Sequence, residues 1–372
     1  MRFDASVGLV IEFRCGLQVE GFCEDADRIL YGESGGHLYL PFARLAVTCY
    51  EIRRDIADLV EKRLATDQMV LTVGYDIENA GYRVVPFVFP HGEASKNLST
   101  YAELVNFLAE KRLTRTDVLV ALGGGVTGDL GGFAAATYLR GIRYVQVPTT
   151  LLAAVDSSVG GKTAVDLPAG KNLAGCFHQP SIVLCDLDML ATLPADTFRD
   201  GCAEVIKYGM IDNAEFLRQL SETPAREQLE HVVTTCVRMK RDVVSEDEFD
   251  RGRRQLLNFG HTFGHAVEAC SRFAVSHGSA VAIGMTMASR AACARGLCGA
   301  DVPEALLALL RQYGLPSETD FSADMLYGAL CADKKIEGSS IHLIVPDRLG
   351  HCRIEPAALS DVPAWLAAGG AK

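Results

Sequence analysis

The chain has 372 residues, enough for two domains of ordinary size, and its 49% hydrophobic and 22% charged residues exclude an intrinsically disordered protein. Asp and Glu outnumber Lys and Arg by 47 to 36, and this balance disfavours a nucleic-acid or anionic-membrane partner. Residues 1–20 lack the features of a signal peptide, and no apolar run approaches the roughly 20 residues of a membrane span. We therefore expect a cytoplasmic protein, in which the 12 cysteines are reduced and mostly buried.

Short β-branched segments alternate with helical ones in the first half of the chain. The sequence predicts strands at 83–89, 117–125, 144–150 and 181–186, and a helix at 99–113 after a Ser cap. Such alternation is typical of βα units, whose strands run parallel. The prediction for residues 1–190 is a parallel, Rossmann-like α/β domain.

The pattern becomes helical after about residue 190. Apolar residues at a period near 3.6 predict helices at 195–211, 226–244, 256–271, 278–296 and 302–314. We therefore expect a second, mostly α-helical domain over residues 191–372. Clefts between two such domains favour ligands, and we expect the active site there.

Two glycine-rich stretches of the first domain are candidates for binding a phosphorylated ligand. In LVALGGGVTGDLGG a strand runs into a glycine turn and a helix, where positive φ and helical N–H groups suit a phosphate. A tight turn that only packs the helix explains this pattern equally, and Asp129 there also favours the helix dipole. In AVDSSVGGKTAVDLPAGKN, Lys162 and Lys171 follow glycine turns, beside Asp156 and Asn172. Lysines on such turns suit an anion, and solvated surface lysines are the alternative.

Histidines of the second domain indicate a metal site. LLNFGHTFGHAVE puts His261 and His265 four residues apart on one helix, and His277 follows in the next helix or loop. CAEVIKYG puts Glu204 and Lys207 on one face of an apolar helix. One carboxylate and two imidazoles, with an open position, are typical of a catalytic divalent ion such as Zn²⁺. The alternative is that these histidines hydrogen-bond within a core.

In combination, these motifs resemble those of the 3-dehydroquinate synthases, a family of sugar phosphate cyclases. The resemblance runs from about residue 83 to 315 through GGGVTGDLGGFAAATYLRG, VDSSVGGKTAVDLPAGKN, AEVIKYG, RRQLLNFGHTFGHAVE and HGSAVAIGM. Ser279 and Asp250 each stand where the family commonly has Glu.

The resemblance implies a role for each residue that matches a family position. The implied ligands of Zn²⁺ or Co²⁺ are Glu204, His261 and His277. The implied active-site histidine is His265, close to the substrate phosphate and to proton transfer. The implied contacts to the substrate carboxylate and hydroxyls are Asp156, Lys162, Lys207, Lys240, Arg254 and Asn258. The implied phosphate-region groups are Lys162, Asn172, Lys334, Lys335 and, from the partner subunit of a homodimer, Arg140. The implied NAD-side residues are Glu93 and Lys96 at the adenosine ribose, with Gly124, Gly125, Asp129, Thr149, Thr150, Lys171 and Thr192.

The resemblance also implies a reaction. NAD-dependent oxidation, β-elimination of phosphate, reduction and an intramolecular aldol closure convert 3-deoxy-D-arabino-heptulosonate 7-phosphate to 3-dehydroquinate, in the shikimate pathway to aromatic amino acids. Other cyclases, which form a valiolone, an inosose or an aminated dehydroquinate, are alternatives. So are a metal-dependent polyol dehydrogenase and a non-catalytic zinc-binding relative that has lost NAD.

The first 82 residues depart from the family pattern. The family grips the cofactor with an Asp and an Asn in a VTD-x-N motif, and here Cys49 and Glu51 stand in their places. Residues 66–79 resemble an insertion. We therefore expect fewer hydrogen bonds to the adenosine end of NAD, which leaves Glu93 and Lys96 to hold most of it.

Overall fold

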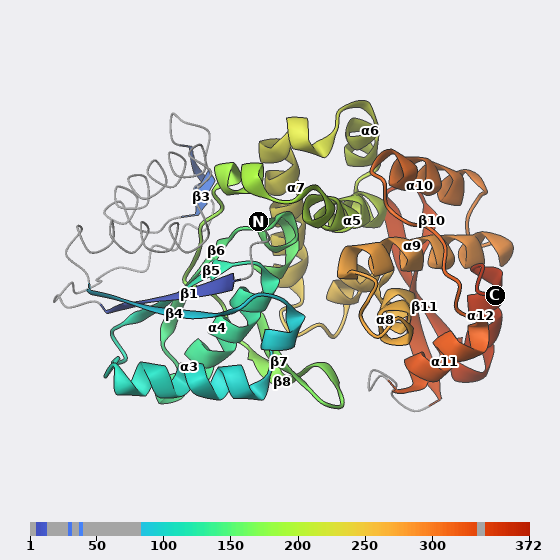
Figure 1. Cartoon of the computed structure of the whole chain (residues 1–372). Helices are drawn as coiled ribbons and strands as arrows, with labels where there is room; N and C mark the ends of the chain where they lie inside the picture. Colours follow the sequence, from blue (N-terminus) through green and yellow to red (C-terminus); the bar gives the residue numbers. More distant parts are fainter. Residues whose placement is uncertain (1–4, 13–28, 32–36, 40–82, 333–338) are drawn as a thin grey trace. The chain divides into compact units, whose positions relative to one another are not determined.

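A computed structural model describes residues 5–12, 29–31, 37–39, 83–332 and 339–372 (Figure 1). The chain divides between Pro194 and Ala195 into two compact units, whereas the sequence pattern changes at about residue 190. Cys49, Glu51 and the insertion at 66–79 lie outside the described residues, as do Lys334 and Lys335.

The first unit is built on a mixed five-stranded sheet. Its strand order is β4-β1-β5-β6-β9, and separate two-stranded sheets are formed by β2 with β3 and by β7 with β8. The strands are β1 Ala5–Glu12, β2 Ile29–Tyr31, β3 His37–Tyr39, β4 Arg83–Pro90, β5 Val118–Gly123, β6 Arg143–Pro148, β7 Lys162–Leu167, β8 Gly170–Phe177 and β9 Ile182–Val183. The helices are α3 Leu98–Glu110 and α4 Gly125–Thr137, with short helical turns η1 Glu93–Ser95, η2 Tyr138–Arg140, η3 Ala153–Ser157 and η4 Leu187–Thr192.

The strands of the predicted βα units run parallel, and one further strand does not. β5 pairs in parallel with β6, and β6 with β9. The prediction of a parallel sheet holds for these strands but not for β1, which lies between β4 and β5 and runs antiparallel to both. A helical crossover makes its flanking strands parallel, and β1 lies outside the alternation of strands and helices that predicted the sheet.

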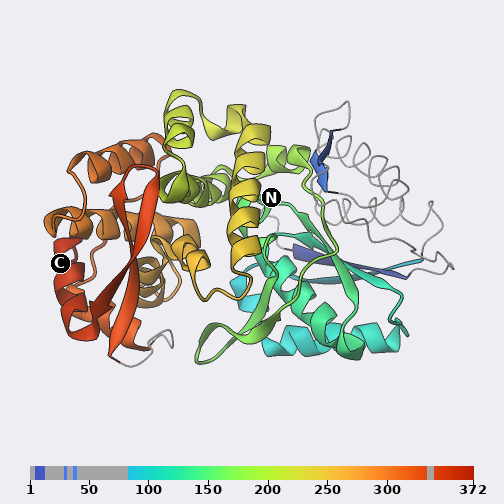
Figure 2. The ribbon, with the colours of Figure 1, turned by 180° about the vertical axis from the view of Figure 1, so that it is seen from behind.

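Helices α3 and α4 lie on the same side of this sheet in both views (Figures 1 and 2). Their fully buried Leu108 and Leu130 share the core of the unit with Tyr144 and Val165. The cap of α3 is Asn97 instead of the predicted serine, and its side chain accepts the N–H groups of two residues in the first turn.

The second unit is mostly helical. Its helices are α5 Ala195–Asp212, α6 Ala214–Glu222, α7 Leu229–Glu246, α8 His261–Cys270, α9 His277–Ala294, α10 Asp301–Gln312, α11 Ala323–Ala332 and α12 Val362–Ala368. Short turns are η5 Ala225–Glu227, η6 Arg253–Asn258 and η7 Leu359–Asp361. An antiparallel hairpin of β10 Ser340–Arg348 and β11 His351–Ala358, prominent in Figure 2, was not predicted. In the described part of the chain, no helix is long and apolar enough to cross a membrane, and the nine cysteines are free.

The predicted helix at 256–271 is instead two elements. The 3₁₀ turn η6 ends at Asn258, and α8 begins at His261. Between them Gly260 has a φ of 79°, which a residue with a side chain rarely adopts. A Cβ at Gly260 would also lie 2.7 Å from the carbonyl oxygen of Val281 in α9. The glycine therefore breaks the helix and lets the start of α8 approach α9 closely.

Candidate active site

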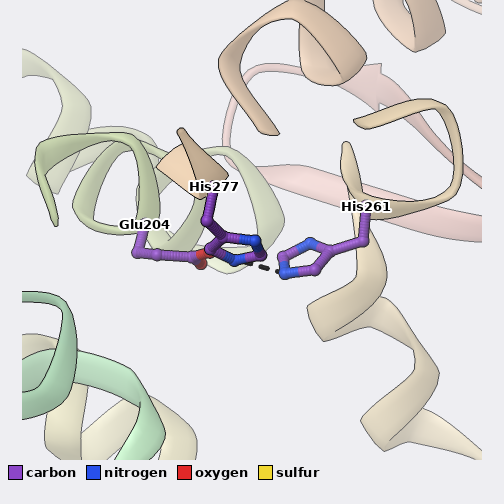
Figure 3. A group of neighbouring side chains, drawn as sticks. All are labelled: Glu204, His261 and His277. Carbon is purple, nitrogen blue, oxygen red and sulfur yellow. Dashed lines mark hydrogen bonds and ion pairs between the residues drawn. The ribbon is translucent and has the colours of Figure 1, made fainter. Parts of the chain in front are cut away.

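Three side chains from three helices converge in the second unit (Figure 3). Glu204 comes from α5, His261 is the first residue of α8 and His277 is the first residue of α9. Glu204 Oε1 lies 3.4 Å from His261 Nε2 and 3.2 Å from His277 Nε2. One ligand atom from each residue lies within 4.8 Å of the other two, so the group could hold a metal ion.

Helix packing brings these residues together. The centre of α5 is buried on every side, from Gly201 to Ile211, so the Glu204 carboxylate has no access to bulk solvent. Helices α8 and α9 are in close contact near their first turns. A Cβ at Gly264 would lie only 2.8 Å from the carbonyl oxygen of Ala280, so the contact requires the glycine. Both histidines therefore face the same buried carboxylate.

Charges around Glu204 keep it ionised. Burial alone raises the pKa of Glu204, but the Lys207 ammonium and the two histidines outweigh burial and hold this pKa well below its usual value. Lys207 is 1% exposed and forms an ion pair with Glu204 Oε2. Burial and the Lys207 charge lower the pKa of His261, which favours the neutral imidazole that binds metals.

The second ring nitrogen of each histidine also has a partner. His261 Nδ1 lies 3.2 Å from the carbonyl oxygen of Phe259, and His277 Nδ1 lies 3.5 Å from Glu268 Oε2. A proton on each Nδ1 satisfies these contacts, and Nε2 is then the nitrogen of each ring that could bind a metal. This arrangement of outer partners is characteristic of metal-binding histidines, so the residues present fit a divalent metal.

His265 lies beside this group. Its ring centroid is 5.5 Å from that of His261 and 6.2 Å from that of His277. His265, Glu268 and His277 also form a group of three that could hold a metal ion. The two histidines therefore occupy different places in the site. His261 faces Glu204 from the first turn of α8, and His265 lies one turn later.

Further cations predicted for the substrate are buried in the same unit. Lys240 in α7 is 6% exposed and Arg254 in η6 is 1% exposed. Turn η6, which ends at Asn258, contacts both α5 and α7. The guanidinium of Arg254 donates to the carbonyl oxygen of Glu248, and its backbone N–H donates to Asp247.

In the first unit, charged residues predicted for NAD form a network. Lys96 Nζ lies 2.6 Å from Glu93, 3.3 Å from Asp129 and 3.8 Å from Asp166, and Lys171 Nζ lies 3.9 Å from Glu93. Burial lowers the pKa of Lys96, but the three carboxylates outweigh burial and raise it above its usual value. Burial raises the pKa of Asp129 to about 6, against the opposing effect of Lys96.

The remaining NAD-side candidates lie mainly at the start of α4. Gly124 caps this helix and Gly125 begins it. Thr149 donates its N–H to the carbonyl oxygen of Gly123, and a Cβ at Gly124 would lie 3.1 Å from a methyl carbon of Thr150. Thr192 ends η4 with an exposed side chain.

Substrate-side and phosphate-region candidates of the first unit lie mostly on the surface. Lys162 begins β7 and is exposed, while the half-buried Asp156 lies in η3. Asn172 is exposed with a φ of 54°, and its N–H donates to Asp166 over 2.8 Å. Arg140 is also exposed, with a φ of 68°.

Two acidic residues of these clusters were missed by sequence reasoning. Asp166 joins the Lys96 network and Asn172, and its only signal was its place at the end of GGKTAVD. Glu268 is seven residues after His261 and three after His265, so helical spacing could have put it on their face.

Comparison with known proteins identifies the same family over most of the chain. A model of the 3-dehydroquinate synthase N-terminal domain matches residues 86–200, and one of the C-terminal domain matches residues 201–336. A 3-dehydroquinate synthase of Streptococcus suis is 44% identical over 302 residues, which are 79% of this chain and 85% of the relative. One of Nostoc punctiforme is 45% identical over 297 residues, or 77% and 82% of the two chains.

Solved structures of two other cyclases share the fold. A 2-deoxy-scyllo-inosose synthase complexed with carbaglucose-6-phosphate, NAD⁺ and Co²⁺ has a TM-score of 0.67 and 30% identity. A 2-epi-5-epi-valiolone synthase of Streptomyces hygroscopicus with NAD⁺ and Zn²⁺ bound has a TM-score of 0.69 and 28% identity. Each likeness covers 75% of this chain and 81% of the other.

Proposed function

The chain belongs to the 3-dehydroquinate synthase family, and from this membership we propose that it converts 3-deoxy-D-arabino-heptulosonate 7-phosphate to 3-dehydroquinate and phosphate. The proposal includes a lyase reaction that depends on NAD and a divalent metal, Zn²⁺ or Co²⁺. It also includes a cytoplasmic homodimer acting in the shikimate pathway. The observation that carries it is the convergence of Glu204, His261 and His277 beside His265 and the buried ammonium of Lys207.

In this proposal Glu204, His261 and His277 hold the metal, while Glu93, Lys96, Asp129 and Lys171 belong to the NAD site. The chemistry supplied by these groups when bound is polarisation of a substrate oxygen by the metal and reversible acceptance of a hydride by NAD. Lys207, Lys240 and Arg254 bind the substrate carboxylate and hydroxyls, and their buried charges stabilise the negative charge that develops during elimination. A ring nitrogen of His265 exchanges a proton with the substrate. Lys162 and Asn172 bind the phosphate.

The direct test incubates the purified protein with the heptulosonate phosphate, NAD⁺ and Zn²⁺ and follows phosphate release and product identity. We expect stoichiometric phosphate and 3-dehydroquinate, with no net NADH. A valiolone, inosose or aminated dehydroquinate from the corresponding substrate would identify one of the sister cyclases instead. Absence of NAD binding and of turnover with every substrate would indicate a non-catalytic relative.

The two histidines four residues apart should differ in a metal-content assay. His261→Ala removes one of three proposed ligands, so both activity and bound zinc should fall. His265→Ala should lower activity by about a hundredfold or more, as expected for loss of a proton-transfer group, while zinc content stays near one per chain. Loss of zinc in His265→Ala but not in His261→Ala would overturn the ligand assignment.

A further inference from the structure

Two carboxylates other than Glu204 lie at His277 or at the residues next to it in the chain. Asp200, on α5, contacts the start of the helix that carries His277, and Glu268, on α8, contacts its imidazole ring. Neither was among the predicted site residues. Asp200 therefore holds the backbone next to one proposed metal ligand, and Glu268 contacts the ring of that ligand.

Asp200 caps α9 from a neighbouring helix. Its carboxylate accepts the N–H of Gly278 over 3.0 Å and the N–H of Ser279 over 2.9 Å, and it also accepts the hydroxyl of Ser276. The first N–H groups of a helix have no partner within it, and Ser276 at the cap position makes no capping bond with its own side chain. Asp200 therefore supplies the cap, and its negative charge also favours the helix dipole.

The same contact fixes α5 against α9. A Cβ at Gly278 would lie 1.9 Å from the carbonyl oxygen of Asp200, so the two backbones touch where His277 begins its helix. Glu204 lies one helical turn after Asp200 on α5. The separation of Glu204 and His277 is therefore set by a junction in which Asp200 is the polar contact.

Glu268 holds the ring of His277. It is 3% exposed, and its Oε2 lies 3.5 Å from His277 Nδ1, while His277 Nε2 faces Glu204. A carboxylate cannot donate when it is ionised, so the contact places the proton on Nδ1. Nε2 is then the ring nitrogen that could bind a metal between Glu204 and His261.

We propose that Asp200 and Glu268 are positioning residues that hold His277 in the orientation that binds the divalent metal, Asp200 through the backbone next to it and Glu268 through its ring. The proposal rests on the proposed metal site. Outer partners of this kind typically change metal affinity by about tenfold to a hundredfold when they are removed.

The test measures Co²⁺ affinity of the full-length protein after removal of metal with a chelator. Competition with a chromophoric chelator gives the dissociation constant, and the visible absorption of bound Co²⁺ reports its ligand geometry. Glu268→Leu and Asp200→Ala should each weaken Co²⁺ binding by about tenfold to a hundredfold. Glu268→Gln and Asp200→Asn keep one acceptor oxygen and should recover part of the loss, and they serve as the test where the larger changes do not fold.

Two matched variants control for stability. Asp117→Asn alters a buried carboxylate of the first unit that accepts the Thr114 N–H, and Asn213→Ala removes the side-chain cap of α6. Both should lower the melting temperature of the metal-free protein without changing Co²⁺ affinity. A loss of affinity in these controls as large as in the Asp200 and Glu268 variants would reduce the effect to general stability and overturn the proposal.

His261→Ala separates this inference from the proposed metal site itself. If His261→Ala binds Co²⁺ as tightly as the wild type, the proposed metal site is wrong, and with it the positioning proposal. If His261→Ala loses Co²⁺ while all the Asp200 and Glu268 variants keep wild-type affinity and spectrum, the metal site stands and the positioning proposal fails.

Discussion

Asp129 is a partly buried carboxylate whose protonation should affect stability. Its pKa is raised by burial from 3.8 to about 6, so between these values the folded chain binds more protons than the unfolded chain. The contribution of Asp129 to the unfolding free energy therefore falls as pH rises from about 4 to 6 and stays low above that window. Asp129→Asn lacks this titration. Its melting temperature relative to the wild type should be a few degrees higher at pH 7.5 than at pH 4.5.

Thermal unfolding of both proteins across this pH range measures the difference, in which titrating groups that do not interact with Asp129 cancel. If the melting temperature of Asp129→Asn relative to the wild type stays constant or falls as pH rises, Lys96 keeps the pKa of Asp129 near its usual value.

For single residues, the sequence predicted which residue types form the site. It could not predict the distances between their side chains. His261 and His277 were named from the chemistry of imidazole ligands, and the structure brings both within 3.4 Å of Glu204. Asp200 and Glu268 were missed because their importance comes from contacts across helices. Helical spacing cannot predict that Asp200 contacts the residues around position 277, which lies 77 positions later in the chain.

The crossing of α8 and α9 depends on the absence of side chains where the two helices touch. Gly264→Ala adds a Cβ 2.8 Å from the carbonyl oxygen of Ala280, so the helices must separate. Because each helix carries one proposed ligand in its first turn, we expect a lower melting temperature, a loss of about 1–3 kcal/mol, and weaker Co²⁺ binding. Gly328→Ala is the matched control. A Cβ there meets nothing within 4 Å on the exposed side of α11, and the change should stabilise the protein slightly.

Unfolding by denaturant and chelator competition test both expectations. Wild-type stability and Co²⁺ affinity in Gly264→Ala would mean that the helices have room to absorb the methyl group.

Elements with a clear period were predicted well, and the exceptions have local causes. Helices α5, α9 and α10 lie where the apolar period indicated, and so do strands β4, β5 and β6. The apolar period continues through residues 256–271, but the left-handed backbone of Gly260 interrupts the helix. The hairpin of β10 and β11 was missed because its pairing joins residues up to 18 apart, a relation that no local period reports.

Over the whole molecule, the candidate NAD residues and the candidate metal ligands lie in different units. Lys96 and its carboxylates belong to the unit that ends at Pro194, and Glu204 with both histidines belongs to the unit that begins at Ala195. The hydrophobic pattern of the sequence changes near residue 190, close to this division, because parallel βα units and packed helices have different hydrophobic periods.

Binding of the two cofactors should therefore be separable by mutation. Lys96→Met removes the cation at the centre of its network, and we expect NAD⁺ affinity to fall by at least about tenfold, as for loss of a charge-assisted hydrogen bond. Co²⁺ affinity should stay within about twofold, because the Lys96 network and the proposed metal ligands share no residue. His261→Ala should show the reverse pattern, and both variants should lose turnover, because the proposed reaction needs both groups.

Lys111→Met controls for a general loss of basic charge. It removes a cation just after α3 that lies over the ring of Phe107, and it should change neither affinity. Calorimetry with NAD⁺ and chelator competition with Co²⁺ measure the two affinities on the same preparations. If either variant loses both ligands together, the two sites are energetically coupled, and the roles assigned to Lys96 and His261 can no longer be separated by unit.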